Sequence, residues 1–229
     1  MPLFNVIYPR FSALVATGEL DRLTQGYCFI TRLLATVLFP SAMLLVNYSQ
    51  ELVLVWTGNA EIAKNVAPII SLLESEYALH GVIYIAYALQ LAFGLVRLIL
   101  TINTITLTIL FPLIIIFVVK YGALGGALGL LLIHMLSVFF GTWLTHRRVL
   151  KGLWSKWLFQ DVGIPLAISI VTGVVSYLIT KSMNNAVYLK LTIGLISVLV
   201  AVSVSILLTP QFRMVVLSIL NGNKIIEPI

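Results

Sequence analysis

The chain has 229 residues, of which 60% are hydrophobic and only 10% are charged, and its mean hydropathy is +1.08. This balance excludes a soluble globular domain and predicts an all-α, polytopic integral membrane protein. The net charge of +6 therefore indicates membrane topology rather than nucleic-acid binding. Cys28 is the single cysteine, which excludes an internal disulfide and a thiolate metal site.

The N-terminal segment, residues 1–27, is predicted to contain the end of a truncated helix followed by a cytoplasmic connection. Its first eight residues are mostly apolar but too few to cross a bilayer, so we interpret them as the last turns of a helix whose beginning is absent. Residues 9–26 carry Arg10, Glu19, Asp21 and Arg22, a composition typical of a polar cytoplasmic connection with a short interfacial helix.

The first predicted membrane span covers residues 28–56. Arg32 can extend its charge to one interface, and Trp56 suits the opposite interface. Pro40 is expected to kink this helix, because it lacks a backbone N–H. Asn47 and Glu51 lie four residues apart and so share one face.

The most polar face of any predicted helix lies within residues 62–97. A helical period of 100° per residue places six polar or aromatic side chains within about half of the circumference. These are Glu76, His80, Tyr84, Tyr87, Gln90 and Arg97. Ionisable groups in a membrane span are costly to insert and usually face a cavity or another helix.

The depth of Glu76 in the membrane is left open by the sequence. The 36 residues from 62 to 97 would span about 54 Å as a helix, far more than a hydrocarbon core of about 30 Å. A membrane span over residues 77–96 leaves Glu74 and Glu76 at the outer headgroups, whereas one over residues 66–88 buries them.

Four further apolar runs complete a prediction of about six transmembrane helices, at residues 98–119, 122–144, 162–180 and 189–208. The fourth span begins with two small-residue pairs, Gly122/Gly126 and Gly125/Gly129, which favour close helix packing. The resulting organisation is four spans in residues 28–144, a basic cytoplasmic loop at 145–161, two spans in 162–209 and a cytoplasmic tail at 210–229.

The distribution of basic residues predicts the orientation. Six spans put both termini on one side, together with ten of the fourteen lysines and arginines, whereas Lys64, Lys120, Lys181 and Lys190 fall on the other side. The excess of basic residues marks the cytoplasmic side. Both termini are therefore expected in the cytoplasm.

Motifs of soluble enzymes are absent from the sequence: there is no phosphate-binding glycine loop, HExxH or nucleophile elbow. The three histidines have no metal-ligand spacing, so no metal or cofactor is expected. His134 is interpreted as a polar group packed between helices. The row of Ser169, Thr172, Ser176 and Thr180 on the fifth span is expected to join helices.

Two interpretations remain open for the polar face. Glu76 and His80 either satisfy each other's polar atoms or take part in a substrate or proton pathway. Arg32 and Arg97 either bind an anionic headgroup or serve as positive-inside anchors. Asn47 and Glu51 are further candidates for the substrate pathway.

Six short motifs occur in an order that resembles one family. They are YPRFSAL at 8–14, LVWTGN at 54–59, YALQLAFG at 87–94, FPL at 111–113, KYGALGGALG at 120–129 and HRRVLKG at 146–152. Together they resemble the bacterial O-antigen and polysaccharide flippases of the multidrug/oligosaccharidyl-lipid/polysaccharide exporter superfamily. The resemblance covers about residues 8–210 and corresponds to the C-terminal lobe region of such transporters.

The resemblance implies that an undecaprenyl-pyrophosphate-linked oligosaccharide is moved across the inner membrane by alternating access of two helical lobes. Family members usually have twelve or more helices, so the chain is expected to be a truncated or split C-terminal part. Its expected partners are the bilayer, the lipid-linked oligosaccharide and the missing N-terminal half or another transporter subunit. The alternatives are a drug or peptidoglycan-precursor exporter of the same superfamily, a non-functional remnant or helper subunit, and a membrane-embedded glycan polymerase or ligase.

Overall fold

The computed structural model describes residues 2–183 and 186–209, and every regular element in these ranges is helical. The predicted all-α fold is therefore confirmed, while the predicted tail at 210–229 lies outside the described residues. The helices, of which η1 and η2 are π-helical, are α1 Pro2–Thr17, α2 Leu20–Thr57, α3 Ala60–Ala92, α4 Val96–Leu136, η1 Ser137–Gly141, α5 Thr142–Val149, α6 Leu153–Lys156, η2 Trp157–Gly163, α7 Ile164–Thr180 and α8 Val187–Leu208.

Five continuous helical stretches in the described residues are long and apolar enough to cross a membrane. One of them, Val96–Val149, has 54 residues, or about 81 Å of helix, which is too long for one crossing. The backbone of this stretch reverses at Gly122, where φ is 61° and ψ is −140°. With its two arms counted separately, this stretch brings the described residues to six long helical passes, which is consistent with the prediction of about six transmembrane helices.

The two arms of this hairpin pack against each other through glycines. A Cβ atom on Gly129 would lie 2.6 Å from Cγ1 of Ile114, and one on Gly125 would overlap the backbone of Phe117. The predicted close packing is thus confirmed for Gly125 and Gly129. Gly122 has a different role, because its positive φ allows the backbone to reverse direction between the two arms.

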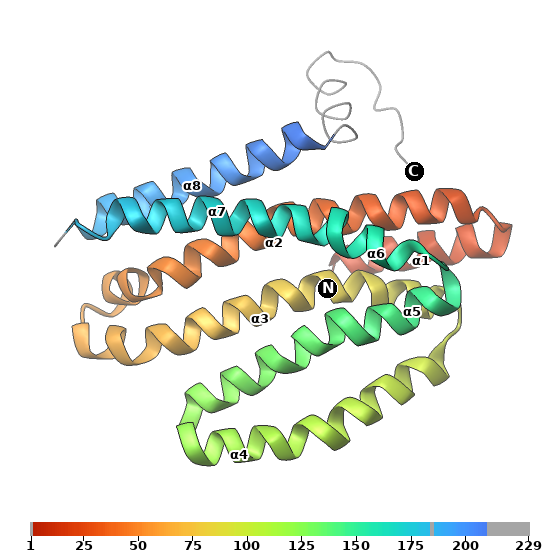
Figure 1. Ribbon diagram of the computed structural model, residues 1–229, viewed down its shortest axis with the longest axis horizontal. Helices are drawn as coiled ribbons and strands as arrows, with labels where there is room; N and C mark the ends of the chain where they lie inside the picture. Colours follow the sequence, from red (N-terminus) through yellow and green to blue (C-terminus); the bar gives the residue numbers. More distant parts are fainter. Residues whose placement is uncertain (1, 184–185, 210–229) are drawn as a thin grey trace.

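The helices lie roughly side by side along the long axis of the molecule (Figure 1). Helices α7 and α8 lie against α2 on one side, α3 packs along α2, and the α4 hairpin lies beyond α3 on the other side. α1 turns back at Gly18 and packs against α3. The order α8, α2, α3, α4 places α3 in contact with two different parts of the bundle.

The outer surface of the bundle is strongly apolar. Large hydrophobic side chains such as Ile109, Val119 and Leu199 are 64%, 80% and 67% exposed. So many large exposed apolar side chains are unfavourable in water but suit a lipid environment. The burial pattern therefore agrees with the composition in making this a membrane-embedded protein.

Two segments expected to be connections are helical. α1 continues through Pro9 to Thr17, because Ile7 and Phe11 on one of its faces are buried against the main core and this packing offsets the lost backbone hydrogen bond. α2 then begins at Leu20, so residues 9–26 do not form a separate interfacial helix. Most of the predicted basic loop at 145–161 is also helical, since Trp157 and Asp161 are buried there.

The break in the first long span lies at Tyr48 and not at the expected position, Pro40. Tyr48 is the residue of α2 whose backbone leaves helical geometry, with φ −121° and ψ 19°. Its ring is buried and lies close to Gly194 of α8, where an added Cβ would be 2.7 Å from Cε2 of Tyr48. Packing of α2 against α8 thus coincides with the break.

Candidate functional site

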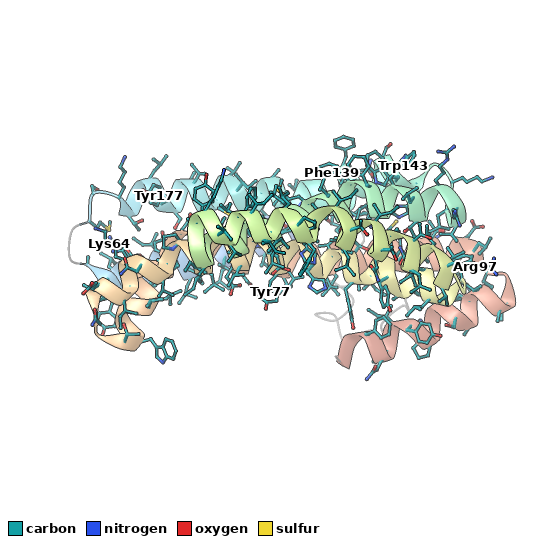
Figure 2. All side chains as sticks on the ribbon, turned by 90° about the horizontal axis from the view of Figure 1, so that it is seen from below. Lys64, Tyr77, Arg97, Phe139, Trp143 and Tyr177 are labelled. Atoms are coloured by element: carbon teal, nitrogen blue, oxygen red, sulfur yellow. The ribbon has the colours of Figure 1, made fainter. Side chains whose placement is uncertain are left out.

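The candidate site is centred on Glu76, the middle residue of α3, which begins at Ala60 and ends at Ala92. Glu76 is only 5% exposed, and its Oε1 lies 2.9 Å from Nδ1 of His134. Its neighbour Tyr77 lies between Lys64 and Arg97 along the long axis of the molecule (Figure 2). A helix centred in the bilayer would place this carboxylate in the hydrocarbon region, and a partner is then essential.

His134 reaches Glu76 because the α4 hairpin folds back on itself. The two residues are 58 positions apart in the sequence, and the reversal at Gly122 returns the second arm of the hairpin along α3. Nδ1 of His134 also lies 3.1 Å from the carbonyl oxygen of Leu130 in its own helix. The interpretation of His134 as a polar group packed between helices is confirmed, and its partner is the buried carboxylate.

His80 completes a three-residue cluster. Its Nδ1 lies 3.9 Å from Oε1 of Glu76, one helical turn away on α3. Its ring stacks on that of His134, with centroids 4.6 Å apart and an interplanar angle of 29°. Glu76, His80 and His134 each offer a ligand atom within 4.8 Å of the others, so three side chains with no metal-ligand spacing in the sequence are brought together by the fold.

Aromatic rings extend the site along α3. The rings of Tyr84 and Tyr87 stack with centroids 6.2 Å apart, and the edge of Tyr84 meets His80 at the same separation. Phe4 of α1 lies against both tyrosines, at 5.1 Å and 6.1 Å. The tyrosine-bearing face predicted from the sequence is therefore continuous with the charged cluster and is closed on one side by α1.

Gln90 marks the other end of this face. Its Nε2 donates a 2.6 Å hydrogen bond to Oγ1 of Thr145 in α5, and Thr145 in turn donates to the carbonyl oxygen of Gly141 at 2.8 Å. Both side chains are buried. Gln90 therefore fixes the register between α3 and the end of the hairpin.

A cavity of about 340 Å³ lies between α3 and the two arms of the hairpin. Its wall combines the aromatic and imidazole side chains of α3 with amide and hydroxyl groups from the hairpin. The polar and aromatic lining residues are His80, Tyr84, Tyr87, Gln90, Asn103, Thr106, His134, Ser137 and Thr142. Such a cavity can hold a small polar group or a segment of a larger ligand inside an apolar bundle.

The other predicted site residues lie outside the cavity, and all of them except Arg97 make contacts between helices. Arg32 forms an ion pair with Asp161, in which its Nε donates to Oδ1 at 2.9 Å. Asn47 donates from Nδ2 to the carbonyl oxygen of Gly173 at 3.0 Å. Arg97 is exposed near the start of α4, at the opposite end of the molecule from Lys64 (Figure 2).

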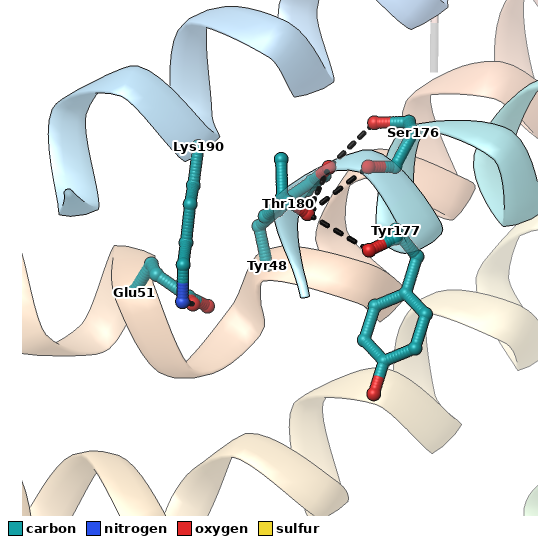
Figure 3. A network of polar contacts seen from close by, with 6 residues as sticks. All are labelled: Tyr48, Glu51, Ser176, Tyr177, Thr180 and Lys190. Atoms are coloured by element: carbon teal, nitrogen blue, oxygen red, sulfur yellow. Dashed lines mark hydrogen bonds and ion pairs between the residues drawn. The ribbon is translucent and has the colours of Figure 1, made fainter. Parts of the chain in front are cut away.

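Glu51 and two residues of the hydroxyl row of α7, Ser176 and Thr180, belong to a polar contact region between α2, α7 and α8 (Figure 3). Nζ of Lys190 lies 3.0 Å from Oε1 of Glu51. The hydroxyl of Tyr48 bonds to Ser176 Oγ at 2.5 Å and to Thr180 Oγ1 at 3.2 Å. The predicted role of Ser176 and Thr180 in joining helices is confirmed, whereas Ser169 and Thr172 bond to carbonyl oxygens of α7 itself.

Sequence reasoning found the α3 face of the site but not the hairpin face. His134, Asn103, Thr106 and Ser137 were not among the predicted site residues, although all four line the cavity. The available signal was a costly ionisable residue at mid-span in the fourth helix, which needs a polar partner. Glu76 was the natural candidate for the polar partner of His134.

The geometry thus combines a buried carboxylate, two stacked imidazoles, two tyrosines and a cavity inside a helical membrane protein. Comparison with protein-family models, with curated proteins and with solved structures finds no match to this chain.

Proposed function

We propose that this chain forms part of a transporter that moves an undecaprenyl-pyrophosphate-linked oligosaccharide across the bacterial inner membrane. The observation that carries the proposal is the cavity between α3 and the α4 hairpin, beside the buried Glu76. Polar groups and space inside a membrane bundle are expensive to maintain and mark substrate or ion pathways. The resemblance of the six ordered sequence motifs to polysaccharide flippases supports the same substrate class.

The lining of the cavity suits an amphiphilic substrate. The stacked rings of Tyr84 and Tyr87 offer flat apolar faces with polar hydroxyls, a surface against which a sugar ring can pack. Asn103 and Thr106 add hydrogen-bonding groups from the opposite wall. We further propose that the exposed Arg97 attracts the pyrophosphate group at the cytoplasmic end, where the planar guanidinium suits phosphate oxygens.

Glu76, His80 and His134 supply a group that can exchange a proton during transport. Oε1 of Glu76 and Nδ1 of His134 lie 2.9 Å apart, close enough for a proton to pass from one to the other. Protonation of Glu76 removes a negative charge from the bilayer interior and weakens its attraction for His134. Because these residues come from α3 and from the hairpin, their protonation state biases how closely the two elements pack.

Alternating access requires two bodies that move about one site, and a second body is therefore part of the proposal. We propose that it is supplied by another transporter subunit. In this arrangement the termini and the basic segment containing Arg147 and Lys151 face the cytoplasm. Reporter fusions at Gly152 and Lys181 test the orientation: the first should report the cytoplasm and the second the periplasm, and a periplasmic signal at Gly152 would contradict it.

The transport experiment uses a strain that lacks its O-antigen flippase. The chain is co-expressed with the N-terminal half of an O-antigen flippase, and surface polysaccharide is measured. Restoration is expected with the pair but not with the chain alone. Glu76→Gln and His80→Ala should reduce the amount of surface polysaccharide at unchanged protein level. Glu74→Gln, which removes a neighbouring carboxylate outside the cluster, should leave that amount unchanged. Failure of the pair to restore polysaccharide, or full activity in both site variants, would contradict the proposal.

A further inference from the structure

Three potential metal-ligating side chains converge from two helices that are far apart in the sequence. Glu76 and His80 occupy successive turns of α3, and His134 comes from the returning arm of the hairpin. One ligand atom from each lies within 4.8 Å of the other two. Two histidines and one carboxylate form a donor set that binds zinc in proteins and leaves a fourth position for water or substrate.

The spacing of these atoms is close to that of a tetrahedral site. Zinc–nitrogen and zinc–oxygen bonds of about 2.0–2.1 Å put neighbouring ligand atoms about 3.3 Å apart. The separations from Oε1 of Glu76 are 2.9 Å to His134 and 3.9 Å to His80, which bracket this value. The third pair of ligand atoms, from His80 and His134, lies within 4.8 Å, so rotation of the side chains can bring the three atoms around one ion.

We propose that Glu76, His80 and His134 form a binding site for a divalent transition metal, with Zn²⁺ as the preferred ion. The open fourth position faces the cavity, because His80 and His134 both line its wall. The side chain of His80 is 41% exposed and that of His134 is 18% exposed, so an ion can reach the cluster from the cavity side. The buried Glu76 supplies the negative charge that offsets part of the charge of the ion.

The bound metal would also fix the position of the hairpin. It links α3 to the second arm of the hairpin through Glu76, His80 and His134, and so reinforces the Glu76–His134 contact that the protein makes by itself. Metal and proton compete for the same ligand atoms. This inference does not rest on the proposed transport function, since a metal site formed by these residues binds its ion whether or not the protein transports a glycan.

The test is direct metal binding by the purified full chain in detergent, prepared with an affinity tag that contains no histidine. Zn²⁺ alone is titrated by calorimetry, and Co²⁺ alone is titrated by visible absorption, which reports tetrahedral coordination. One ion per chain is expected. Glu76→Gln, His80→Ala and His134→Ala should each weaken binding by at least about 100-fold, the upper range seen when a group supporting a metal ligand is lost.

Two matched controls separate the site from general metal affinity. Glu74→Gln removes a carboxylate two residues away on the same helix, and His146→Gln removes the remaining histidine, which lies between Tyr27 and Trp157. Both should keep the affinity of the parent chain. Helical content and elution volume are compared for all variants, and partly exposed His80 also allows His80→Gln as a mild replacement.

The outcomes are decisive in either direction. Absence of stoichiometric Zn²⁺ binding by the parent chain would overturn the proposal, whatever the variants do. Binding that survives His80→Gln and His134→Ala, or that falls equally in Glu74→Gln, would also overturn it. Loss of transport in a Glu76 variant without any Zn²⁺ binding by the parent would leave the proposed function standing and refute the metal site alone.

Discussion

Replacing Asp161 with asparagine should destabilise the fold, because it leaves the charge of Arg32 without its partner inside the bundle. Asp161 has a fully buried side chain, and that of Arg32 is 16% exposed. Nε and Nη2 of Arg32 both donate to Oδ1 of Asp161, which joins α2 to the segment before α7. Breaking a buried ion pair by removing one partner costs about 3–5 kcal/mol.

The double variant Arg32→Met with Asp161→Leu supplies the control. Replacing both members of a buried ion pair by apolar residues of similar size is often neutral or stabilising. The double variant should therefore recover most of the free energy of unfolding lost by Asp161→Asn. Unfolding by denaturant in mixed micelles can be followed by tryptophan fluorescence, to which Trp157 contributes a buried ring whose Nε1 donates to Thr31 at 3.2 Å.

The reasoning would be refuted by either of two results. The first is that Asp161→Asn keeps the stability of the parent chain, because water or another group would then already satisfy the charge of Arg32. The second is that the double variant is less stable than Asp161→Asn. That order would show that the two side chains contribute independently rather than as a pair.

Two further substitutions test the packing of individual helices. Gly129→Leu should lower the free energy of unfolding by about 1–3 kcal/mol, because its Cβ would lie 2.6 Å from Ile114. Gly126→Ala should be tolerated, because its Cβ would lie 3.4 Å from Val118. Equal effects of the two substitutions on the denaturant midpoint would contradict the hairpin packing. Tyr48→Phe should lower the free energy of unfolding by about 1 kcal/mol, because it removes the hydrogen bonds to Ser176 and Thr180. Tyr177→Phe, at an exposed position, should leave the free energy of unfolding unchanged. An unchanged denaturant midpoint in Tyr48→Phe would contradict the network in Figure 3.

The individual helices were largely predictable from the sequence, because each apolar run long enough for a membrane span forms a helix. The reversal near Gly122 was also accessible, since Lys120 and Tyr121 interrupt two long apolar runs. The helical path through Pro9 was not accessible. It depends on Ile7 and Phe11 meeting a core that is built from residues far along the chain.

The candidate site was predicted only in part for a related physical reason. Helical periodicity places Glu76, His80 and Tyr84 on one face of α3, and this requires only local geometry. The meeting of Glu76 with His134 depends on the turn at Gly122 and on the rotation of the returning arm about its own axis. The periodicity of one helix predicts neither the geometry of that turn nor the rotation of the arm. The same limit explains why Arg32 and Glu51, both costly groups in a span, were not matched with Asp161 and Lys190.

Both proposals for the site require that Glu76 and His134 meet inside the membrane, and cross-linking in membranes tests this contact most directly. Cys28→Ala removes the native thiol, Glu76→Cys and His134→Cys introduce a pair, and a protease site placed at the turn of Gly94 separates the two helices after cleavage. A short flexible thiol reagent should hold the two fragments together. The control pair Glu76→Cys with Leu199→Cys, an exposed position of α8, should release them. Release of both pairs, or equal retention of both, would contradict the account.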